Sequence, residues 1–332
     1  MTKVFDFIDD AREKLWKDKH QEIMSLVDPE TRKVYQHMVS IINCPICDVD
    51  DAHLVFEKEG FDFVKCRHCG LLYVNPQLKP DVAESFYKKS KTASNWINVQ
   101  SGSKEQDWNS QKKYLPALER LQELKPAGGR LLDVGCSIGQ FLNISKDFGW
   151  AGEGIELNHD AAEYARREYG LTVYEQRLEQ LEQKEESYDL ITLWGVLEHL
   201  NDPNMMLKTV RRFLKKEGLL LLFVPNGHSL IVRLSREHNS TVSGRAHLWY
   251  FTPRTIGQIL SKNGFSKKIE FSVLPQLHEI QHFLQYNTMY REPEMLCEDE
   301  LVFDDQTKNV LEAYINSKNM GYKLITIAEL SK

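Results

Sequence analysis

The chain has 332 residues, of which 42% are hydrophobic and 27% are charged, so it can bury the cores of two or three folded units. This composition excludes a disordered or fibrous protein. The formal net charge of −6 argues against non-specific binding to nucleic acid, which requires a dense basic surface. No apolar run approaches the ~18 residues of a membrane span. The N-terminus has no basic region followed by an apolar one, so we expect a cytoplasmic protein.

The N-terminal third of the sequence predicts three segments of different character. Residues 1–42 have apolar positions at helical spacing and predict an N-terminal helical segment. Residues 43–80 contain cysteines and short β-rich runs, which predict a small ribbon. Residues 81–125 return to polar, helical patterning, and they contain a polar stretch at 92–105 with Ser, Gly and Lys that is suited to a linker or lid.

From residue 126 onward, strand and helix patterns alternate regularly. The apolar runs RLLDVG, WAGEGIEL, LTVYE and YDLITLW each precede a helical stretch, and LLLLFVPN closes the series. This alternation predicts an α/β fold, a parallel Rossmann-like sheet with helices on both faces. The run YKLITIAEL at 322–330 predicts a last strand, and residues 275–320 predict a helical insertion before it.

Four of the six cysteines form two Cys-x2-Cys pairs, Cys44 with Cys47 and Cys66 with Cys69, separated by eighteen residues. This spacing is typical of a structural zinc site. Four thiolates complete a tetrahedron and leave no position for water or substrate, so the expected metal is structural Zn²⁺. His68 lies inside the second pair and is expected to face solvent. A disulfide or four unrelated thiols is the alternative.

A glycine-containing loop follows the first strand of the alternating region. The stretch LLDVGCSIGQFL places Asp133, Gly135 and Gly139 between that strand and a helix, whose free N–H groups face a ligand. Glu156 closes the next strand, where a carboxylate can accept both hydroxyl groups of a ribose. The dinucleotide pattern G-x-G-x-x-G is absent. The spacing D-x-G-x3-G instead predicts a loop that cradles the methionine part of S-adenosylmethionine.

Four stretches of the sequence resemble class I S-adenosylmethionine-dependent methyltransferases. They are LLDVGCSIGQFL, GWAGEGIELNHDAAEYAR, SYDLITLWGVLEHLNDPNMMLKTVRRFLKKEGLLLLFVPN and HLWYFTPRTIGQILSKNGF. Together with the cysteine pairs they resemble the subgroup with an N-terminal zinc ribbon, which includes sugar and other small-molecule methyltransferases. The resemblance implies a seven-stranded sheet in which residues 322–330 lie antiparallel beside the fifth strand. Ser137 replaces a glycine common in such loops, a change that the backbone tolerates if φ stays below zero.

The resemblance also implies which residues bind S-adenosylmethionine. The implied cofactor ligands are Asp133, Gly135 and Gly139 at the methionine end, Glu156 at the ribose, Arg177 and Leu178 at the adenine, and Trp194 and Gly195 beside the methionine carboxylate and the sulfonium. Trp194 could also be an ordinary core residue.

Methyl transfer is a direct displacement, in which the enzyme aligns donor and acceptor. A hydroxyl or carbon acceptor must also lose a proton, which histidine can accept near neutral pH. His199 follows the fourth strand and His247 follows the fifth, so both are candidate bases, with a purely structural role as the alternative. Glu198 and His199 could also hold a catalytic divalent cation. The candidate acceptor contacts are Asn226, Trp249 and Tyr250.

These features predict an S-adenosylmethionine-dependent methyltransferase that acts on a small or carrier-linked acceptor. The expected acceptor is a hydroxyl, or a carbon, of a sugar or polysaccharide precursor. An RNA base methyltransferase that uses the ribbon to recognise RNA is a second hypothesis, which the net charge of −6 disfavours. A non-enzymatic cofactor-binding scaffold is a third, which the intact loop at Asp133 and Glu156 disfavours. The acceptor's identity and the oligomeric state stay open.

Overall fold

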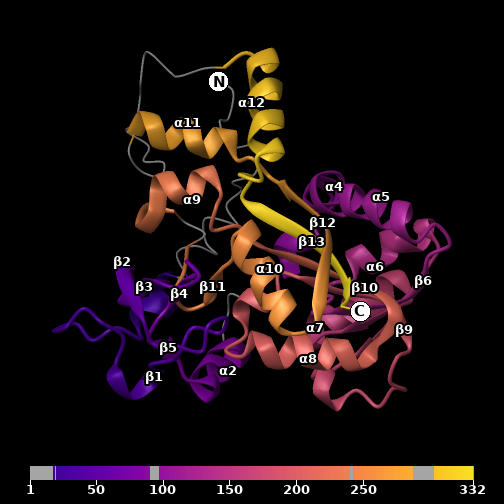
Figure 1. The fold of residues 1–332 in the computed structure, drawn as a ribbon, viewed down its shortest axis with the longest axis horizontal. Coiled ribbons are helices and arrows are strands. Elements are labelled where there is room, and N and C mark those ends of the chain that lie inside the picture. Colours follow the sequence, from indigo (N-terminus) through magenta and orange to yellow (C-terminus); the bar gives the residue numbers. More distant parts are fainter. Residues whose placement is uncertain (1–17, 19, 90–96, 240–241, 287–302, 332) are drawn as a thin grey trace. The chain divides into compact units, whose positions relative to one another are not determined.

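The structure is a computed structural model, and the residues that it describes are 18, 20–89, 97–239, 242–286 and 303–331. The chain divides into two compact units (Figure 1). Unit 1 comprises residues 1–86, 225–255 and 271–324, and unit 2 comprises residues 87–224, 256–270 and 325–332. Unit 1 thus groups the ribbon with two later segments of the chain. No helix in the described part of the chain combines the length and apolar character that a membrane crossing requires.

Seven strands form one mixed sheet in the order β12-β13-β10-β9-β6-β7-β8. The strands are β6 (Gly129–Val134), β7 (Trp150–Ile155), β8 (Thr172–Tyr174), β9 (Tyr188–Trp194), β10 (Leu214–Pro225), β12 (Phe265–Val273) and β13 (Lys323–Leu330). The five strands from β10 to β8 are paired in parallel. Their sequences are continuous apolar runs because both faces of a parallel sheet are covered, and Leu190, Ile191 and Leu193 of β9 are fully buried.

The last strand, β13, lies between β12 and β10 and runs antiparallel to both. Tyr322 N–H donates to the Leu274 carbonyl and Ser331 N–H donates to the Gly264 carbonyl, so β13 starts where β12 ends. Asn226 N–H donates to the Tyr322 carbonyl, so β13 also starts where β10 ends. The expected seven-stranded Rossmann-like sheet, with its last strand inserted beside the fifth, is therefore confirmed.

Helices and helical turns precede the first strand of the sheet and follow its parallel strands. They are α4 (Ser103–Asn109), the π-helix η2 (Ser110–Tyr114), α5 (Leu115–Leu124), α6 (Gln140–Ser145), η3 (Lys146–Phe148), α7 (His159–Tyr169), η4 (Leu178–Gln180), η5 (Leu197–His199), α8 (Pro203–Phe213) and α10 (Pro253–Lys262). The sequence explains their limits. The N-cap side chain of Asn158 begins α7 and Gly170 ends it in a left-handed conformation, while Asp202 caps α8.

Unit 1 contains the cysteine ribbon. Its strands are β1 (Val39–Ser40), β2 (Ala52–Lys58), β3 (Phe61–Cys66), β4 (Leu72–Val74), β5 (Gln77–Leu78) and β11 (Trp249–Tyr250). Four of them form the sheet β11-β4-β3-β2, and β1 pairs with β5. The strand β11 follows β10 in the chain and pairs antiparallel with β4, so a distant segment completes the ribbon.

The ribbon shares one apolar core with the helices of unit 1. These are η1 (Gln36–Met38), α2 (Pro80–Lys89), α9 (Leu230–Ser235), η6 (Arg236–His238), α11 (Leu277–Tyr286) and α12 (Asp305–Ser317). Leu26 from the N-terminal segment packs in a cluster with Phe63, Ile231, Ile280 and Ile315. The predicted insertion at 275–320 thus contributes α11 and α12 to this core, and residues 287–302 of it lie outside the described residues.

The described part of the predicted N-terminal helical segment, residues 1–42, contains a short helix followed by turns. Residues 20–24 are helical, but the chain then turns and forms β1. The Asp28 carbonyl accepts a hydrogen bond from Arg32 N–H, and Asp28 N–H donates one to the Lys33 carbonyl. Val27 and Val34 form an isolated antiparallel β-bridge. The apolar residues there pack on the core from a turn. Their spacing in the sequence resembles that of a helix, so periodicity alone does not distinguish the two structures. The first 17 residues lie outside the described residues.

Candidate functional site

The loop between β6 and α6 requires glycine at two positions. Gly135 and Gly139 have φ values of 76° and 77°, in the left-handed region. A Cβ atom on Gly135 would lie 2.6 Å from Val196 Cγ2, and one on Gly139 would lie 2.5 Å from Leu171 Cδ1. The loop therefore brings its bare backbone close to neighbouring elements, and its N–H groups stay available to a ligand.

Ser137, at the tip of this loop, also adopts a left-handed conformation, with φ of 49°. The condition that the sequence analysis set for tolerating a serine here, a φ below zero, is not met. Two hydrogen bonds hold it there: its N–H donates to Glu156 Oε2 at 3.0 Å, and its Oγ donates to Gln100 Oε1 at 2.5 Å. These bonds compensate a conformational cost of about 1 kcal/mol or more for a residue other than glycine.

Glu156 directly follows β7, and its carboxylate is buried and fixed in place. Oε1 accepts from Asn158 N–H at 2.7 Å, and Oε2 accepts from Ser137 N–H. Burial raises the pKa of Glu156, and the backbone hydrogen bonds oppose that shift. Each carboxylate oxygen has a further lone pair, so the group can accept two ligand hydroxyls without moving.

Asp133 lies near the end of β6 and is 1% exposed. Its Oδ1 accepts a hydrogen bond from Thr192 Oγ1 at 2.6 Å. Burial raises the pKa of Asp133 to about 7, and the charge of Glu156 adds to this shift, while the Thr192 hydroxyl opposes it. The carboxyl group therefore titrates near neutral pH, and a cationic group bound beside it would favour its ionised form.

Aromatic rings surround Trp194 at the carboxyl end of β9. The Trp194 ring centroid lies 4.9 Å from those of Tyr114 and Phe141 and 5.1 Å from that of Phe223. Its buried Nε1 has no hydrogen-bond partner among the described residues. The next residue, Gly195, has φ of 69°. Tyr114, which the sequence analysis missed, belongs to the π-helix η2, a form that is frequent at functional sites.

Most of the predicted cofactor ligands come together in unit 2. Asp133 lies near the end of β6, and Gly135 follows that strand. Glu156 follows the adjacent strand β7, and Trp194 ends β9, which pairs with β6 on its other side. The carboxyl ends of parallel strands are where α/β sheets bind ligands. Arg177 is exposed and precedes η4, in which Leu178 is buried.

The predicted bases lie in different units. In unit 2, His199 is exposed at the end of η5, its N–H donates to the Val196 carbonyl at 3.0 Å, and the adjacent Glu198 is buried. In unit 1, His247 is partly buried, and its N–H donates to the Ser243 carbonyl at 3.0 Å. Each histidine remains a candidate base within its own unit.

Asn226, a candidate acceptor contact, makes hydrogen bonds that join two segments of the chain. Its side chain is fully buried, and Nδ2 donates to the Asn319 and Gly321 carbonyls at 2.8 Å each. Its Oδ1 accepts from His228 N–H at 2.9 Å. The amide thereby fastens the end of β10 to the chain that enters β13.

Trp249 and Tyr250 are also core residues and not exposed acceptor contacts. Trp249 is 0% exposed, and its ring stacks on Tyr73 of β4 with centroids 5.9 Å apart. Tyr250 is 1% exposed, and its hydroxyl accepts from Ser243 N–H. The sequence analysis proposed both residues as acceptor contacts beside His247, and in the structure the pairing of β11 with β4 buries both side chains.

His228 is a partly buried histidine that the sequence analysis missed. It follows the end of β10, a position similar to that of His199 after β9. Burial and the charge of Arg233 lower its pKa, so the imidazole is neutral and can accept a proton at neutral pH. The signal that could have found it is a histidine just beyond a parallel strand.

The four paired cysteines converge in the ribbon. Their Sγ atoms all lie within 4.8 Å of one another, and all four are free thiols, so a disulfide is not formed. Burial would raise the pKa of the Cys66 thiol, but hydrogen bonds from Cys69 and His68 N–H groups and from neighbouring thiols lower it to about 7. His68 is exposed to solvent, as expected, and its ring forms a hydrogen bond with the Asp51 carboxylate. This donor set fits a tetrahedral thiophilic ion such as Zn²⁺.

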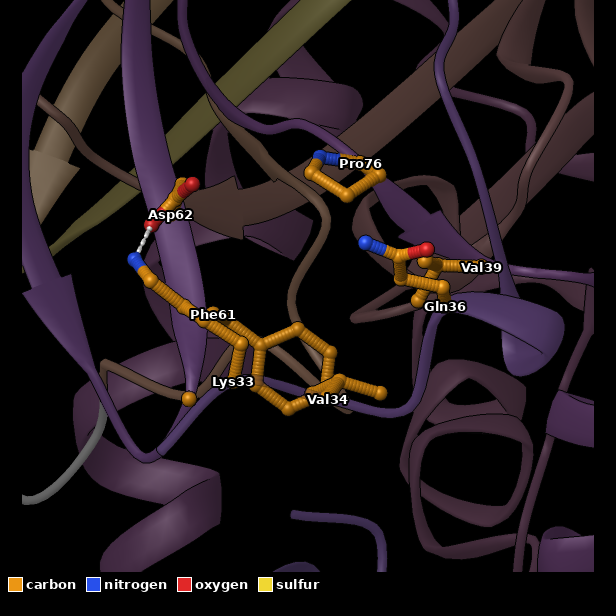
Figure 2. A pocket seen from close by; sticks show the side chains of 8 residues that line it. Lys33, Val34, Gln36, Val39, Phe61, Asp62 and Pro76 are labelled. Atoms are coloured by element: carbon orange, nitrogen blue, oxygen red, sulfur yellow. Dashed lines mark hydrogen bonds and ion pairs between the residues drawn. The ribbon is translucent and has the colours of Figure 1, made fainter. Parts of the chain in front are cut away.

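Unit 1 also contains a cavity of about 180 Å³, and none of the predicted site residues lines it. Figure 2 shows the ion pair between Lys33 and Asp62 at its wall, with Gln36, Val39 and Pro76 across from it. Its lining combines the Lys33–Asp62 ion pair and Gln36 with mostly apolar side chains.

Comparison with known proteins agrees with this geometry. Residues 108–268 match a family model described as a methyltransferase domain. Together with the sheet order and the loop at Asp133, this match identifies the chain as carrying a class I methyltransferase domain of the S-adenosylmethionine-dependent kind.

Individual relatives are similar over parts of the chain. The ubiquinone biosynthesis O-methyltransferase of Haemophilus ducreyi is 28% identical over 137 residues, 38% of this chain and 56% of the relative. A solved complex between the Haloferax volcanii Trm112 methyltransferase activator and a methyltransferase matches 72% of this chain and 96% of its own, at 16% identity and a TM-score of 0.50.

The 1,6-didemethyltoxoflavin-N1-methyltransferase of Burkholderia thailandensis, solved with bound S-adenosylhomocysteine, matches 85% of this chain and 100% of its own, at 12% identity and a TM-score of 0.50. These structural matches show the fold. The chain spans about half the length of the curated relatives that it matches.

Proposed function

We propose that this protein transfers a methyl group from S-adenosylmethionine to a small-molecule acceptor. The observation that carries the proposal is the pair formed by the glycine loop and Glu156, whose carboxylate is buried and oriented by two backbone N–H groups. Such a carboxylate suits the two hydroxyls of a ribose. The names of the curated relatives, O-methyltransferases of ubiquinone biosynthesis, support a hydroxyl acceptor.

The proposed acceptor is a hydroxyl, or a carbon, of a sugar or polysaccharide precursor. Its support is the cysteine ribbon, which the chain shares with sugar methyltransferases in the resemblance described above. A phenolic hydroxyl is the class that the ubiquinone-related names would suggest. The net charge of −6 disfavours RNA as acceptor.

The cofactor would be held along the carboxyl ends of β6, β7, β8 and β9. The proposed ligands are Asp133, Gly135 and Gly139 at the methionine end, Glu156 at the ribose, Arg177 and Leu178 at the adenine, and Trp194 and Gly195 near the sulfonium. Bound S-adenosylmethionine supplies an electrophilic methyl group. The protein's part is to fix the direction of approach, and the aromatic rings of Tyr114, Trp194 and Phe223 would exclude water from it.

A histidine, His199 or His247, would take the proton of the acceptor. We expect the Gln variant of the base to bind S-adenosylmethionine normally and to lose about 10²–10⁴ in turnover, the usual contribution of a general base. The loss should shrink as pH rises, because an ionised acceptor needs no base. Near-normal turnover in both variants would exclude them, and His228 would then be the next residue to substitute.

The four cysteines would hold one structural Zn²⁺ ion. The support is the convergence of their Sγ atoms within 4.8 Å and the closed donor set, which leaves no position for a substrate. The ion would stabilise the ribbon and take no part in the methyl transfer.

A methyl-donor assay tests the proposed function. Purified protein would be incubated with radiolabelled S-adenosylmethionine and, separately, nucleotide sugars, catechol-type phenols and total RNA, with Glu156→Ala as the control. Transfer to a sugar supports the full proposal, transfer to a phenol changes the acceptor class, and transfer to RNA overturns the small-molecule proposal. Calorimetry that shows binding of NAD and not of S-adenosylmethionine would overturn the cofactor as well.

A further inference from the structure

The segment 97–114 is fastened to the cofactor loop and the helices beside it by neutral side chains. Gln140, the first residue of α6, donates from Nε2 to the Gln106 carbonyl at 2.5 Å and to Ser110 Oγ at 3.1 Å. Tyr169, the last residue of α7, donates from its hydroxyl to Gln106 Oε1 at 3.1 Å. All these residues belong to unit 2.

One bond of this set reaches the tip of the cofactor loop. Ser137 Oγ donates to Gln100 Oε1 at 2.5 Å, while the N–H of the same residue donates to Glu156 Oε2. Ser137 thus connects the segment 97–114 to the carboxylate proposed for the ribose. A glycine at this position could donate from its N–H but could not bond Gln100.

The backbone of Ser137 is strained at the point where it makes this hydrogen bond. Its φ of 49° is left-handed, a conformation that is strained for a residue with a side chain, and such conformations persist where surrounding contacts fix them. The described contacts that fix it are the bonds to Gln100 and Glu156. Loss of the Gln100 bond would leave the peptide free to relax, and its N–H would no longer be held on the Glu156 carboxylate.

We propose that Ser137 and Gln100 are positioning residues for S-adenosylmethionine, acting as a latch that keeps the loop and the Glu156 carboxylate in their binding geometry. This inference rests on the proposed function, because it assumes that Glu156 binds the ribose. The latch acts before chemistry. It therefore affects the affinity for the cofactor and the KM for it, and it leaves kcat at saturating cofactor unchanged.

The variants Ser137→Ala and Gln100→Leu test the latch by calorimetry with S-adenosylmethionine. Each should raise the Kd about 3–10-fold, the value of one net hydrogen bond. The double variant should bind no more weakly than either single variant, because both remove the same bond. Gln111→Leu, an exposed glutamine in the same segment, is the matched control and should bind as the wild type does.

The variant Ser137→Gly distinguishes a role of Ser137 in positioning the cofactor from a role in stabilising the fold. It removes the bond to Gln100 and also the left-handed strain, so we expect a Tm equal to or above that of the wild type together with the weaker binding. Wild-type affinity in Ser137→Gly, or additive losses in the double variant, would overturn the latch. Failure of the wild type itself to bind S-adenosylmethionine would instead overturn the proposed function.

Discussion

Two buried carboxyl groups, Asp133 and Glu156, have different environments at the cofactor loop. Asp133 has one hydroxyl partner, Thr192, and burial raises its pKa to about 7. Burial raises the pKa of Glu156 as well, but two backbone N–H groups oppose that shift and hold the carboxylate in place. The first group therefore responds to pH and to a bound cation, while the second is a fixed acceptor.

Substitution of Glu156 tests its role as the ribose ligand. Glu156→Ala should weaken binding of S-adenosylmethionine by about 10-fold to 100-fold or more, because hydrogen bonds to a charged acceptor are each worth about 1.5–3 kcal/mol. Glu156→Gln keeps the shape but loses the charge, so its loss should be smaller. Calorimetry measures both, and unchanged affinity in the Ala variant would contradict the assignment.

The raised pKa of Asp133 predicts a dependence of stability on pH. Since the folded pKa of about 7 exceeds the ordinary value of 3.8, the stabilisation is complete below pH 4 and is lost as pH rises through 7. Asp133→Asn cannot ionise. Its Tm minus that of the wild type should therefore increase between pH 5 and pH 8, by about 2–4 °C for each kcal/mol. Thermal melts without cofactor check this, and a constant difference would contradict it.

At the scale of elements, the turn from β6 into α6 depends on close contact with α7. A Cβ on Gly139 would lie 2.9 Å from Ala165 Cβ, besides the clash with Leu171. We expect Gly139→Ala to destabilise the fold by about 2–4 kcal/mol, from overpacking and left-handed strain together. The matched control is Gly170→Ala, which has φ of 63° but nothing within 4 Å of the new Cβ, so it bears the strain alone. Urea denaturation measures the free energy of unfolding of both variants. Equal losses would show that the close contact at Gly139 does not contribute to the effect.

The elements of unit 1 are more interdependent than a ribbon with its own core would be. The fourth strand of the ribbon, β11, comes from the segment after β10, and the side chains of β3 pack with α9, α11 and α12. The sequence alone would confine the effect of metal loss to residues 43–76. Because the core is shared, we expect metal loss to affect other elements of unit 1 as well.

At the scale of the whole molecule, removal of zinc should loosen unit 1 and spare unit 2. We expect about one Zn²⁺ per chain by elemental analysis, and chelation should increase hydrogen exchange in β2 to β4, in β11 and in α9. The sheet strands β6, β7 and β9 have their own buried residues and should keep their protection. A control substitution at Cys136, outside the cluster, should leave the metal content unchanged. Absence of metal, or loss of protection in β6, would contradict this prediction.

The sequence by itself determined the features that depend on local spacing. The turn at Gly135 and Gly139, the carboxylate of Glu156 and the two cysteine pairs each occupy a short stretch whose pattern reflects a backbone conformation or a coordination geometry. The five parallel strands were also predictable, because buried parallel strands are read as apolar runs between helices, and the family resemblance implied the place of the last strand.

Only the tertiary structure decided the contacts between residues far apart in the chain. Trp249 pairs with β4, Tyr114 contacts Trp194, and Ser137 donates a hydrogen bond to Gln100 from a left-handed conformation. No periodicity connects these positions, since each contact depends on how separate elements pack. Because the side chain of one residue can serve a binding site or a core equally well, its role is decided by the neighbours that folding brings to it.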